Sequence, residues 1–304
     1  MVPYYDIIGD VHGYATLLEK LLQELGYKKK HGTYSHPSRQ AVFVGDIIDK
    51  GPKIREALFI VRSMVDAGSA QMVLGNHEVN AIGYQYKDLD GNYLRERSDE
   101  NTAQHKETLD AFPDPKEQMD NVKWFQTLPL SLDLGGIRVV HAAWSDEVHQ
   151  EAGKVPYRPR SLLVNFSKYL PTQERYEILC KGYEAELPQG VSFKDDKGKE
   201  RRHLRTKWWK GAKGRTYRDL TLNESLPSPE IPVVDPKLPQ DDYSGEAPVF
   251  FGHYAADPEK LIITSKVACL DYGIYEPRCS PLHAYRWDGE KELSADKIVK
   301  MPHK

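Results

Sequence analysis

Short apolar stretches alternate with segments of helical periodicity along the N-terminal part of the chain. Apolar runs at 4–8, 41–44 and 71–74 predict buried strands, because each run is short and leads into glycine. Apolar residues recur at helical spacing over 15–25 and 54–67, which predicts two amphipathic helices. Because a helix between successive strands makes the strands parallel, this order predicts an α/β sheet covered on its faces.

Apolar runs return in the C-terminal half of the chain. Strands are expected at 137–140 and 249–251, and a histidine follows closely after each of them. Further runs at 261–264, 267–270 and 283–287 predict closing antiparallel strands.

The periodicity weakens between about 145 and 245. Ten lysines and arginines stand against a single acid between Lys197 and Arg218, and prolines crowd the stretch that follows. We expect one domain over residues 1–304, with an insertion or cap at about 145–245.

Composition and charge exclude several classes of protein. Hydrophobic residues make up 39% of the 304 residues, so a sizeable core is expected, and the net charge of -3 argues against a global basic field for nucleic acid. The three cysteines have no metal-type spacing and indicate reduced thiols. No signal-peptide pattern opens the chain and no apolar run approaches the roughly 20 residues of a membrane span, so a cytoplasmic location is expected.

Five short motifs share one format, in which a residue able to bind a metal follows an apolar strand. They are Gly9-Asp10-Val11-His12-Gly13, Gly45-Asp46-Ile47-Ile48-Asp49-Lys50-Gly51, Gly75-Asn76-His77-Glu78, Val140-His141 and Gly252-His253. In open α/β sheets the ligand crevice lies beyond the carboxyl ends of the strands, so the motifs are expected to meet there. Each motif alone is a weak signal, whereas all five in this order make chance turns a poor explanation.

The expected metal ligands are Asp10, His12, Asp46, Asn76, His141 and His253. Mixed carboxylate and imidazole ligands suit manganese, iron, zinc or cobalt better than magnesium or calcium. We expect two divalent transition metals, with manganese as the first choice. Because such a pair can clamp a phosphate and activate a water molecule, the set predicts a metal-dependent hydrolase of phosphoric esters.

The motifs resemble those of the calcineurin-like metallophosphoesterase superfamily. The Gly75-Asn76-His77-Glu78 form resembles its phosphoprotein phosphatase branch, which includes bacterial serine/threonine phosphatases and dinucleoside tetraphosphatases. The similarity covers 5–80 closely and returns at 137–143 and 249–289. It implies an α/β fold of the α+β sandwich type, in which two central mixed β-sheets are flanked by helices in four layers.

The resemblance also assigns roles. Asp10 and His12 would hold one metal, Asp46 would bridge both, and Asn76, His141 and His253 would hold the other, with a metal-bridging hydroxide as the attacking group. His77 would protonate the leaving oxygen, and Asp49 would orient its imidazole. These roles agree with the chemistry, because an alkoxide is hard to expel without an acid nearby and a carboxylate fixes the tautomer of a histidine. The alternative for His77 is a further ligand or a structural side chain.

One departure from the family pattern is Lys50, which stands where the family usually carries arginine. Lysine offers phosphate a point charge, whereas arginine offers a planar fork. The phosphate is expected to contact Asn76 and Lys50, together with an arginine from the basic stretch. Arg215 is the arginine that we carry forward; Arg202, Arg205 and Arg218 are the other candidates, and a solvated basic face is the alternative for the whole stretch.

The leading prediction is hydrolysis of phosphate monoesters, with a phosphoprotein or a small phosphorylated metabolite as substrate. The alternative is hydrolysis of dinucleoside polyphosphates, in which the basic stretch would neutralise several phosphates and Trp208-Trp209 would stack a base. The tryptophans are alternatively an anchor of the insertion on the core, the commoner role of aromatic residues. A non-catalytic binding protein would have lost a ligand or the acid, and all of them are present. Neither a membrane nor nucleic acid is expected as a partner.

Overall fold

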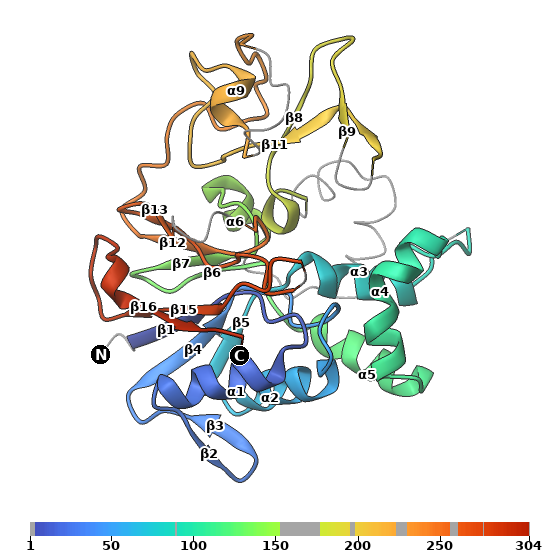
Figure 1. Cartoon of the computed structure of the whole chain (residues 1–304), viewed down its shortest axis with the longest axis vertical. Helices are drawn as coiled ribbons and strands as arrows, with labels where there is room; N and C mark the ends of the chain where they lie inside the picture. The colour runs from blue at the N-terminus through green and yellow to red at the C-terminus, as the bar shows by residue number, and fades with distance from the viewer. Residues whose placement is uncertain are drawn as a thin grey trace.

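The computed structural model describes residues 4–88, 90–152, 177–194, 198–222, 230–255, 261–275 and 277–303. Two five-stranded mixed β-sheets form the centre of the molecule, and helices flank them (Figure 1). This is the α/β architecture of the α+β sandwich type that the sequence predicted.

The first sheet is built around β1 (Tyr4–Ile8). This strand pairs in parallel with β4 (Arg39–Phe43) and antiparallel with β15 (Leu282–Trp287). Beyond them lie β5 (Ala70–Met72), parallel to β4, and β16 (Ile298–Met301), antiparallel to β15. The strands expected near 4–8, 41–44, 71–74 and 283–287 are therefore confirmed, with small shifts at their ends.

The second sheet is built around β12 (Val249–Phe251), which lies between β7 (Arg138–Val140) and β14 (Val267–Cys269) and runs parallel to both. The edges are β6 (Ser131–Asp133) and β13 (Ile262–Thr264), each antiparallel to its neighbour. The antiparallel strands predicted at 261–264 and 267–270 are confirmed as the β13–β14 pair, and β14 in addition runs parallel to β12. β13 lies at the edge of the sheet and reverses the chain, so β14 returns beside β12 in the same direction.

The inner faces of the two sheets form an apolar layer. Ile7 and Val42 contribute to it from the first sheet and Val139, Phe250 and Ala268 from the second, all of them fully buried. Because neighbouring strands within each sheet place their apolar side chains on this shared face, the packing fixes how the carboxyl ends of the strands approach one another.

Helices α1 (Ala15–Glu24) and α2 (Ile54–Asp66) cover the outer face of the first sheet, as the leucine spacing predicted (Figure 1). Helix α3 (Asn76–Gln85) begins directly after β5, and α4 (Asp99–Ala111) and α5 (Pro115–Phe125) pack beside it. The short elements are α6 (Asp146–Ala152), the hairpin of β2 (Lys28–Lys30) and β3 (Thr33–Ser35), and the 3-10 turn η1 (Ala295–Lys297). None of the described helices is long and apolar enough to cross a membrane.

The region expected as a cap contains β8 (Glu184–Glu186), β9 (Phe193–Lys194), β10 (Glu200–Arg201), β11 (His203–Arg205) and α9 (Tyr217–Leu220). It extends beyond the second sheet (Figure 1) and has a small apolar core of its own, with Leu204 and Leu220 among its members. Residues 153–176, 195–197 and 223–229 of the expected insertion, Lys197 among them, lie outside the described residues.

Trp208 and Trp209 join the cap to the main core. Their side chains are buried, and their ring centroids lie 5.4 and 5.6 Å from that of Phe251 on β12. The described tryptophan rings therefore serve as an anchor, and no face of them is free to stack a base. We propose on this basis that residues 145–245 are a cap carried by a single domain rather than a separate domain.

Candidate active site

The five sequence motifs meet at the carboxyl ends of their strands. Asp10 and His12 follow β1, Asp46 follows β4, Asn76 follows β5, His141 follows β7 and His253 follows β12. The rings of His141 and His253 lie 5.1 Å apart, and those of His12 and His77 lie 4.8 Å apart. The structure therefore brings together all six residues that the sequence singled out as ligands.

Asp46 lies at the centre of this cluster. Its Oδ2 lies 3.7 Å from Nε2 of His12, 3.8 Å from Nε2 of His77 and 3.3 Å from Nε2 of His141. Candidate ligand atoms of His12, Asp46 and His77 lie within 4.8 Å of one another, and the same holds for Asp46, His141 and His253. Asp46 is thus shared by two groups, which is the position that a bridging carboxylate requires.

Backbone carbonyl groups orient two of the imidazoles. Nδ1 of His12 lies 3.0 Å from the carbonyl oxygen of Ile48, and Nδ1 of His141 lies 2.8 Å from that of Val44. A carbonyl oxygen can only accept, so each Nδ1 carries a proton, and Nε2 is the ring atom that would bind a metal. Oδ1 of Asn76 lies 3.0 Å from Nε2 of His141 and faces the same space.

Two buried polar atoms in the cluster lack hydrogen-bond partners. They are Oδ1 of Asp10 and Nε2 of His253, whereas Oδ2 of Asp10 accepts a hydrogen bond of 3.1 Å from the backbone N–H of His253. Buried polar atoms are nearly always paired, so these two require a partner that protein atoms do not supply. Two divalent cations would satisfy these atoms, one each, because a carboxylate oxygen and an unprotonated imidazole nitrogen are metal ligands.

The electrostatics of the cluster also fit cations. Burial, reinforced by the charges of Asp271 and Asp46, raises the pKa of Asp10 well above its usual range. Burial raises the pKa of Asp46 too, but His141 and His77 more than reverse this and hold it well below its usual range. Burial and the charge of Arg205 lower the pKa of His253, so this imidazole stays neutral, as a ligand must.

Two glycines allow the carboxylates to approach the backbone. A Cβ atom at Gly75 would lie 2.1 Å from Oδ1 of Asp46, and a Cβ atom at Gly252 would lie 1.9 Å from Oδ1 of Asp10. Any side chain at either position would displace a candidate ligand. The glycines that precede Asn76 and His253 are thus part of the site.

Glu78 fixes the loop that carries Asp46. Its buried carboxylate accepts hydrogen bonds from the backbone N–H groups of Asp46 at 2.9 Å, Ile47 at 2.8 Å and Gly75 at 3.0 Å. One side chain therefore links the end of β4 to the start of α3. Burial, with the charge of Asp46, raises the pKa of Glu78 to about 7.

His77 and Asp49 form the pair that the sequence predicted. Nδ1 of His77 donates to Oδ2 of Asp49 across 2.6 Å, and the backbone N–H of His77 donates to Oδ1 of Asp46 across 2.9 Å. Burial lowers the pKa of His77, but Asp46 and Asp49 outweigh burial and raise it to about 9. In the metal-free protein the imidazole is therefore held in the protonated form, which is the form that an acid needs.

The cationic side chains are arranged differently from the sequence expectation. Lys50 lies at the site, with its Nζ 5.0 Å from the ring centroid of Tyr275, whose edge contacts the His12 ring at 5.2 Å. Arg215 instead pairs with Asp242 inside the cap. The structure thus places the arginine carried forward from the sequence in an ion pair with an acid of the cap.

Arg205 is the arginine of the basic stretch that the structure places beside the site. Its guanidinium lies 5.5 Å from the ring centroid of Tyr254, the residue after His253, and its charge lowers the pKa of His253. Its buried Nε has no hydrogen-bond partner. Other cations of the stretch face acids: Arg202 lies near Glu186, and Arg218 lies near Glu230. These pairs support the interpretation of a solvated face for most of the stretch.

Sequence reasoning missed four contributors to the site. Glu78 stood inside a recognised motif, but its role as an anchor of backbone N–H groups depends on how two loops meet. His105 and Thr108 contact Asp49 from α4, and the only trace in the sequence is a pair of polar residues three apart on a polar helix. Tyr275 belongs to none of the sequence motifs.

Comparison with known proteins agrees with this geometry. The family model described as calcineurin-like phosphoesterase matches residues 5–254. An asymmetrical bis(5'-nucleosyl)-tetraphosphatase PrpE of Oceanobacillus iheyensis is 38% identical over 145 residues, which are 45% of this chain and 54% of that protein. The protein of the same name from Bacillus subtilis is 35% identical over 142 residues, which are 45% of this chain and 57% of that protein. The chain thus spans about half the length of these curated relatives.

Similarity to solved structures is weaker. A putative diadenosine tetraphosphatase has a TM-score of 0.49 at 18% identity, over 99% of this chain and 94% of that chain. A protein serine/threonine phosphatase from Saccharomyces cerevisiae also has a TM-score of 0.49, at 13% identity, over 100% of this chain and 81% of that chain. The family match covers most of the chain and includes all five motifs, so the chain belongs to the calcineurin-like phosphoesterase family.

Proposed function

We propose that the protein is a metal-dependent phosphohydrolase that binds two divalent cations at the cluster around Asp46. The observation that carries the proposal is the shared position of Asp46 between two groups of candidate ligands, next to the unpartnered Oδ1 of Asp10 and Nε2 of His253. When bound, the metals would supply positive charge to the phosphate and an activated water for the attack on phosphorus.

The remaining side chains have separate tasks in this proposal. His77 holds a proton at Nε2 and delivers it to the leaving oxygen, while Asp49 keeps the imidazole in the required orientation. Lys50 and Arg205 bind phosphate oxygens. The guanidinium of Arg205 replaces, from the cap, the planar fork that Lys50 lacks.

The positions of the Lys50 and Arg205 side chains favour an extended polyphosphate substrate. Lys50 reaches the site beside His12, through Tyr275, whereas Arg205 reaches it beside His253, through Tyr254. Because His12 and His253 belong to different groups of candidate ligands, positive charge borders both ends of the cluster. Relatives of this chain are named as bis(5'-nucleosyl)-tetraphosphatases. We therefore place a dinucleoside polyphosphate first among the candidate substrates.

A phosphate monoester is the second candidate, and the pair of His77 and Asp49 favours it. Hydrolysis of a dinucleoside polyphosphate expels a nucleotide, whose phosphate oxygen leaves readily as an anion, whereas an alkoxide needs a proton in the transition state. A histidine whose pKa is raised to about 9 by neighbouring carboxylates, against the effect of burial, is suited to the more demanding leaving group.

A product assay separates the two candidates. Metal-stripped protein is supplied with Mn²⁺ and incubated with diadenosine tetraphosphate, a phosphoserine peptide or a phosphotyrosine peptide, and products are resolved by anion-exchange chromatography. We expect the highest kcat/KM with the dinucleotide. Faster release of inorganic phosphate from a peptide would reverse the order. Failure with all three substrates would contradict the phosphohydrolase itself.

A further inference from the structure

Helix α4 is a polar helix with an unusual buried face. Of its 13 residues, the two that are buried are His105 and Thr108. A surface helix normally buries an apolar stripe against the core, because apolar burial is what stabilises its docking. Here the buried positions are polar, and both contact the carboxylate of Asp49.

The contacts divide the two oxygens of Asp49 between two sides. Oδ1 accepts hydrogen bonds from Nδ1 of His105 at 2.8 Å and from Oγ1 of Thr108. Oδ2 is left to Nδ1 of His77 at 2.6 Å. Oγ1 of Thr108 also accepts a hydrogen bond of 3.0 Å from the backbone N–H of Asp49. The threonine hydroxyl thus holds the backbone and the carboxylate of one residue together, which fixes the rotamer of that carboxylate.

The backbone at Asp49 requires such support. Asp49 has φ of 66° and Lys50 has φ of 72°, both in the left-handed region that disfavours residues with a side chain. Conformations of this kind persist where surrounding contacts over-determine them. The contacts from Thr108 and His105 come from a separate helix and hold this turn in place.

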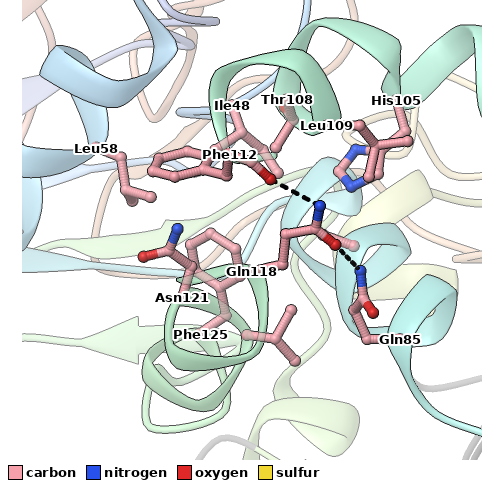
Figure 2. A pocket seen from close by; sticks show the side chains of 12 residues that line it. Ile48, Leu58, Gln85, His105, Thr108, Leu109, Phe112, Gln118, Asn121 and Phe125 are labelled. Atoms are coloured by element: carbon pink, nitrogen blue, oxygen red, sulfur yellow. Dashed lines mark hydrogen bonds between the residues drawn. The ribbon is translucent and has the colours of Figure 1, made fainter. Parts of the chain in front are cut away.

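Apolar packing around His105 and Thr108 is incomplete. A cavity of about 20 Å³, enough for one water molecule, is lined by both residues together with Gln85, Gln118 and Phe112 (Figure 2). Gln118 bridges the carbonyl oxygen of Phe112 at 2.7 Å and the side chain of Gln85 at 2.7 Å, as the dashed lines in Figure 2 show. Close packing alone therefore does not fix the position of α4, and the hydrogen bonds to Asp49 contribute to fixing it.

We propose that His105 and Thr108 are positioning residues for the proton donor: they hold the Asp49 carboxylate so that only its Oδ2 faces His77. The inference rests on the proposed function, in which His77 protonates the leaving oxygen. It adds a second layer, His105 and Thr108, behind the pair that the motifs contain.

Two matched pairs of variants test the proposal. Thr108→Val removes the hydroxyl with little change of shape, whereas Thr108→Ser keeps it. His105→Leu removes the donor, whereas His105→Asn places an amide N–H near the position of Nδ1. Urea unfolding and near-ultraviolet circular dichroism establish that each variant is folded.

The kinetic readout is the dependence on the leaving group. In Thr108→Val and His105→Leu we expect kcat on an alkyl phosphate to fall about 10–100-fold, the range for partners behind a site residue. Turnover of p-nitrophenyl phosphate, whose leaving group needs little protonation, should change far less. Thr108→Ser and His105→Asn should turn over the alkyl phosphate at close to the wild-type rate. Adding Thr108→Val or His105→Leu to His77→Asn should lower kcat no further than His77→Asn alone. Equal losses on both substrates, or full additivity with His77→Asn, would overturn the proposal.

A second readout needs no turnover. In the metal-free protein, the proton in the short, charge-assisted bond between His77 and Asp49 should give a downfield NMR resonance that is absent in His77→Asn. We expect Thr108→Val and His105→Leu to shift or lose this resonance, and Thr108→Ser and His105→Asn to keep it. An unchanged resonance in both disruptive variants would refute the positioning role. Absence of activity in the wild-type protein would instead contradict the proposed function and leave the NMR comparison to decide on the positioning residues.

Discussion

Gly75→Ala tests the arrangement of the cluster with the smallest possible change. The backbone at Gly75 has φ of -88° and ψ of 171°, which alanine adopts without strain, so the effect of the new methyl group is steric. That methyl carbon would lie 2.1 Å from Oδ1 of Asp46 and 2.4 Å from its backbone nitrogen. Contacts below 3.0 Å are not tolerated, so the carboxylate must move by about 0.9 Å at least.

A displacement of this size has a calculable consequence. A misplacement of about 1 Å at a catalytic centre can lower the rate about 100-fold. Because Asp46 is shared by both groups of candidate ligands, we also expect a loss of metal affinity. The assay combines hydrolysis of p-nitrophenyl phosphate at saturating Mn²⁺ with calorimetric titration of Mn²⁺ into the metal-free protein.

Gly68→Ala is the matched control, because Gly68 has φ of 71° and a Cβ atom there would meet nothing within 4 Å. Alanine at this position is strained by about 1–2 kcal/mol, so the control loses stability without touching the site. Wild-type turnover and wild-type Mn²⁺ affinity in Gly75→Ala would refute the placement of Asp46 against Gly75.

Three further predictions concern the phosphate contacts, the proton donor and the cap. Arg205→Gln should lower kcat/KM about 10–100-fold, because it removes a hydrogen bond from a charged donor to the phosphate. Arg215→Gln should leave kcat/KM unchanged, because Arg215 is paired with Asp242. Steady-state kinetics on the preferred substrate compare the two variants. Because Asp46 and Asp49, against burial, raise the pKa of His77 from 6.5 to about 9, protonated His77 should stabilise the metal-free protein by up to about 3 kcal/mol below pH 6.5, and this should be lost as the pH rises through 9. Urea unfolding at pH 6.5 and 9.5 measures the difference, which His77→Asn should lack. Trp208→Ala should destabilise the protein by about 3–5 kcal/mol, because the ring is 2% exposed and packs on Phe251. Urea unfolding measures this loss of stability, and Trp287→Phe is measured in the same way for comparison.

The sequence predicted the strands and the ligand set because their signals are local. Each apolar run has the length of a strand, and each is followed by glycine or directly by a residue able to bind a metal, so a short window contains the whole pattern. The common edge of the sheets then brings Asp46, His141 and His253 together, although they are far apart in the chain. In this part of the molecule, local propensity and global fold agree.

The remaining features depend on contacts between distant segments. Arg205 and Arg215 carry the same charge in the same basic stretch, and only the pairing of β11 with β8, and of Arg215 with Asp242, separates their positions. The parallel pairing of β14 with β12 depends on β13 lying at the sheet edge. The contacts of His105 and Thr108 with Asp49 span 56 and 59 residues of sequence, and α4 has no apolar stripe to signal its buried face.

The most direct test of the account is the metal dependence of turnover in the wild-type protein and in Asp46→Asn. Metal-stripped protein is supplied with Mn²⁺, Zn²⁺, Co²⁺ or Mg²⁺ in turn, and bound metal and hydrolysis of p-nitrophenyl phosphate and diadenosine tetraphosphate are measured on the same samples. We predict two divalent ions per wild-type chain with restored turnover, and reduced occupancy without turnover in Asp46→Asn. Full turnover in the metal-free protein, or wild-type occupancy and turnover in Asp46→Asn, would contradict the claim that two metals meet at Asp46.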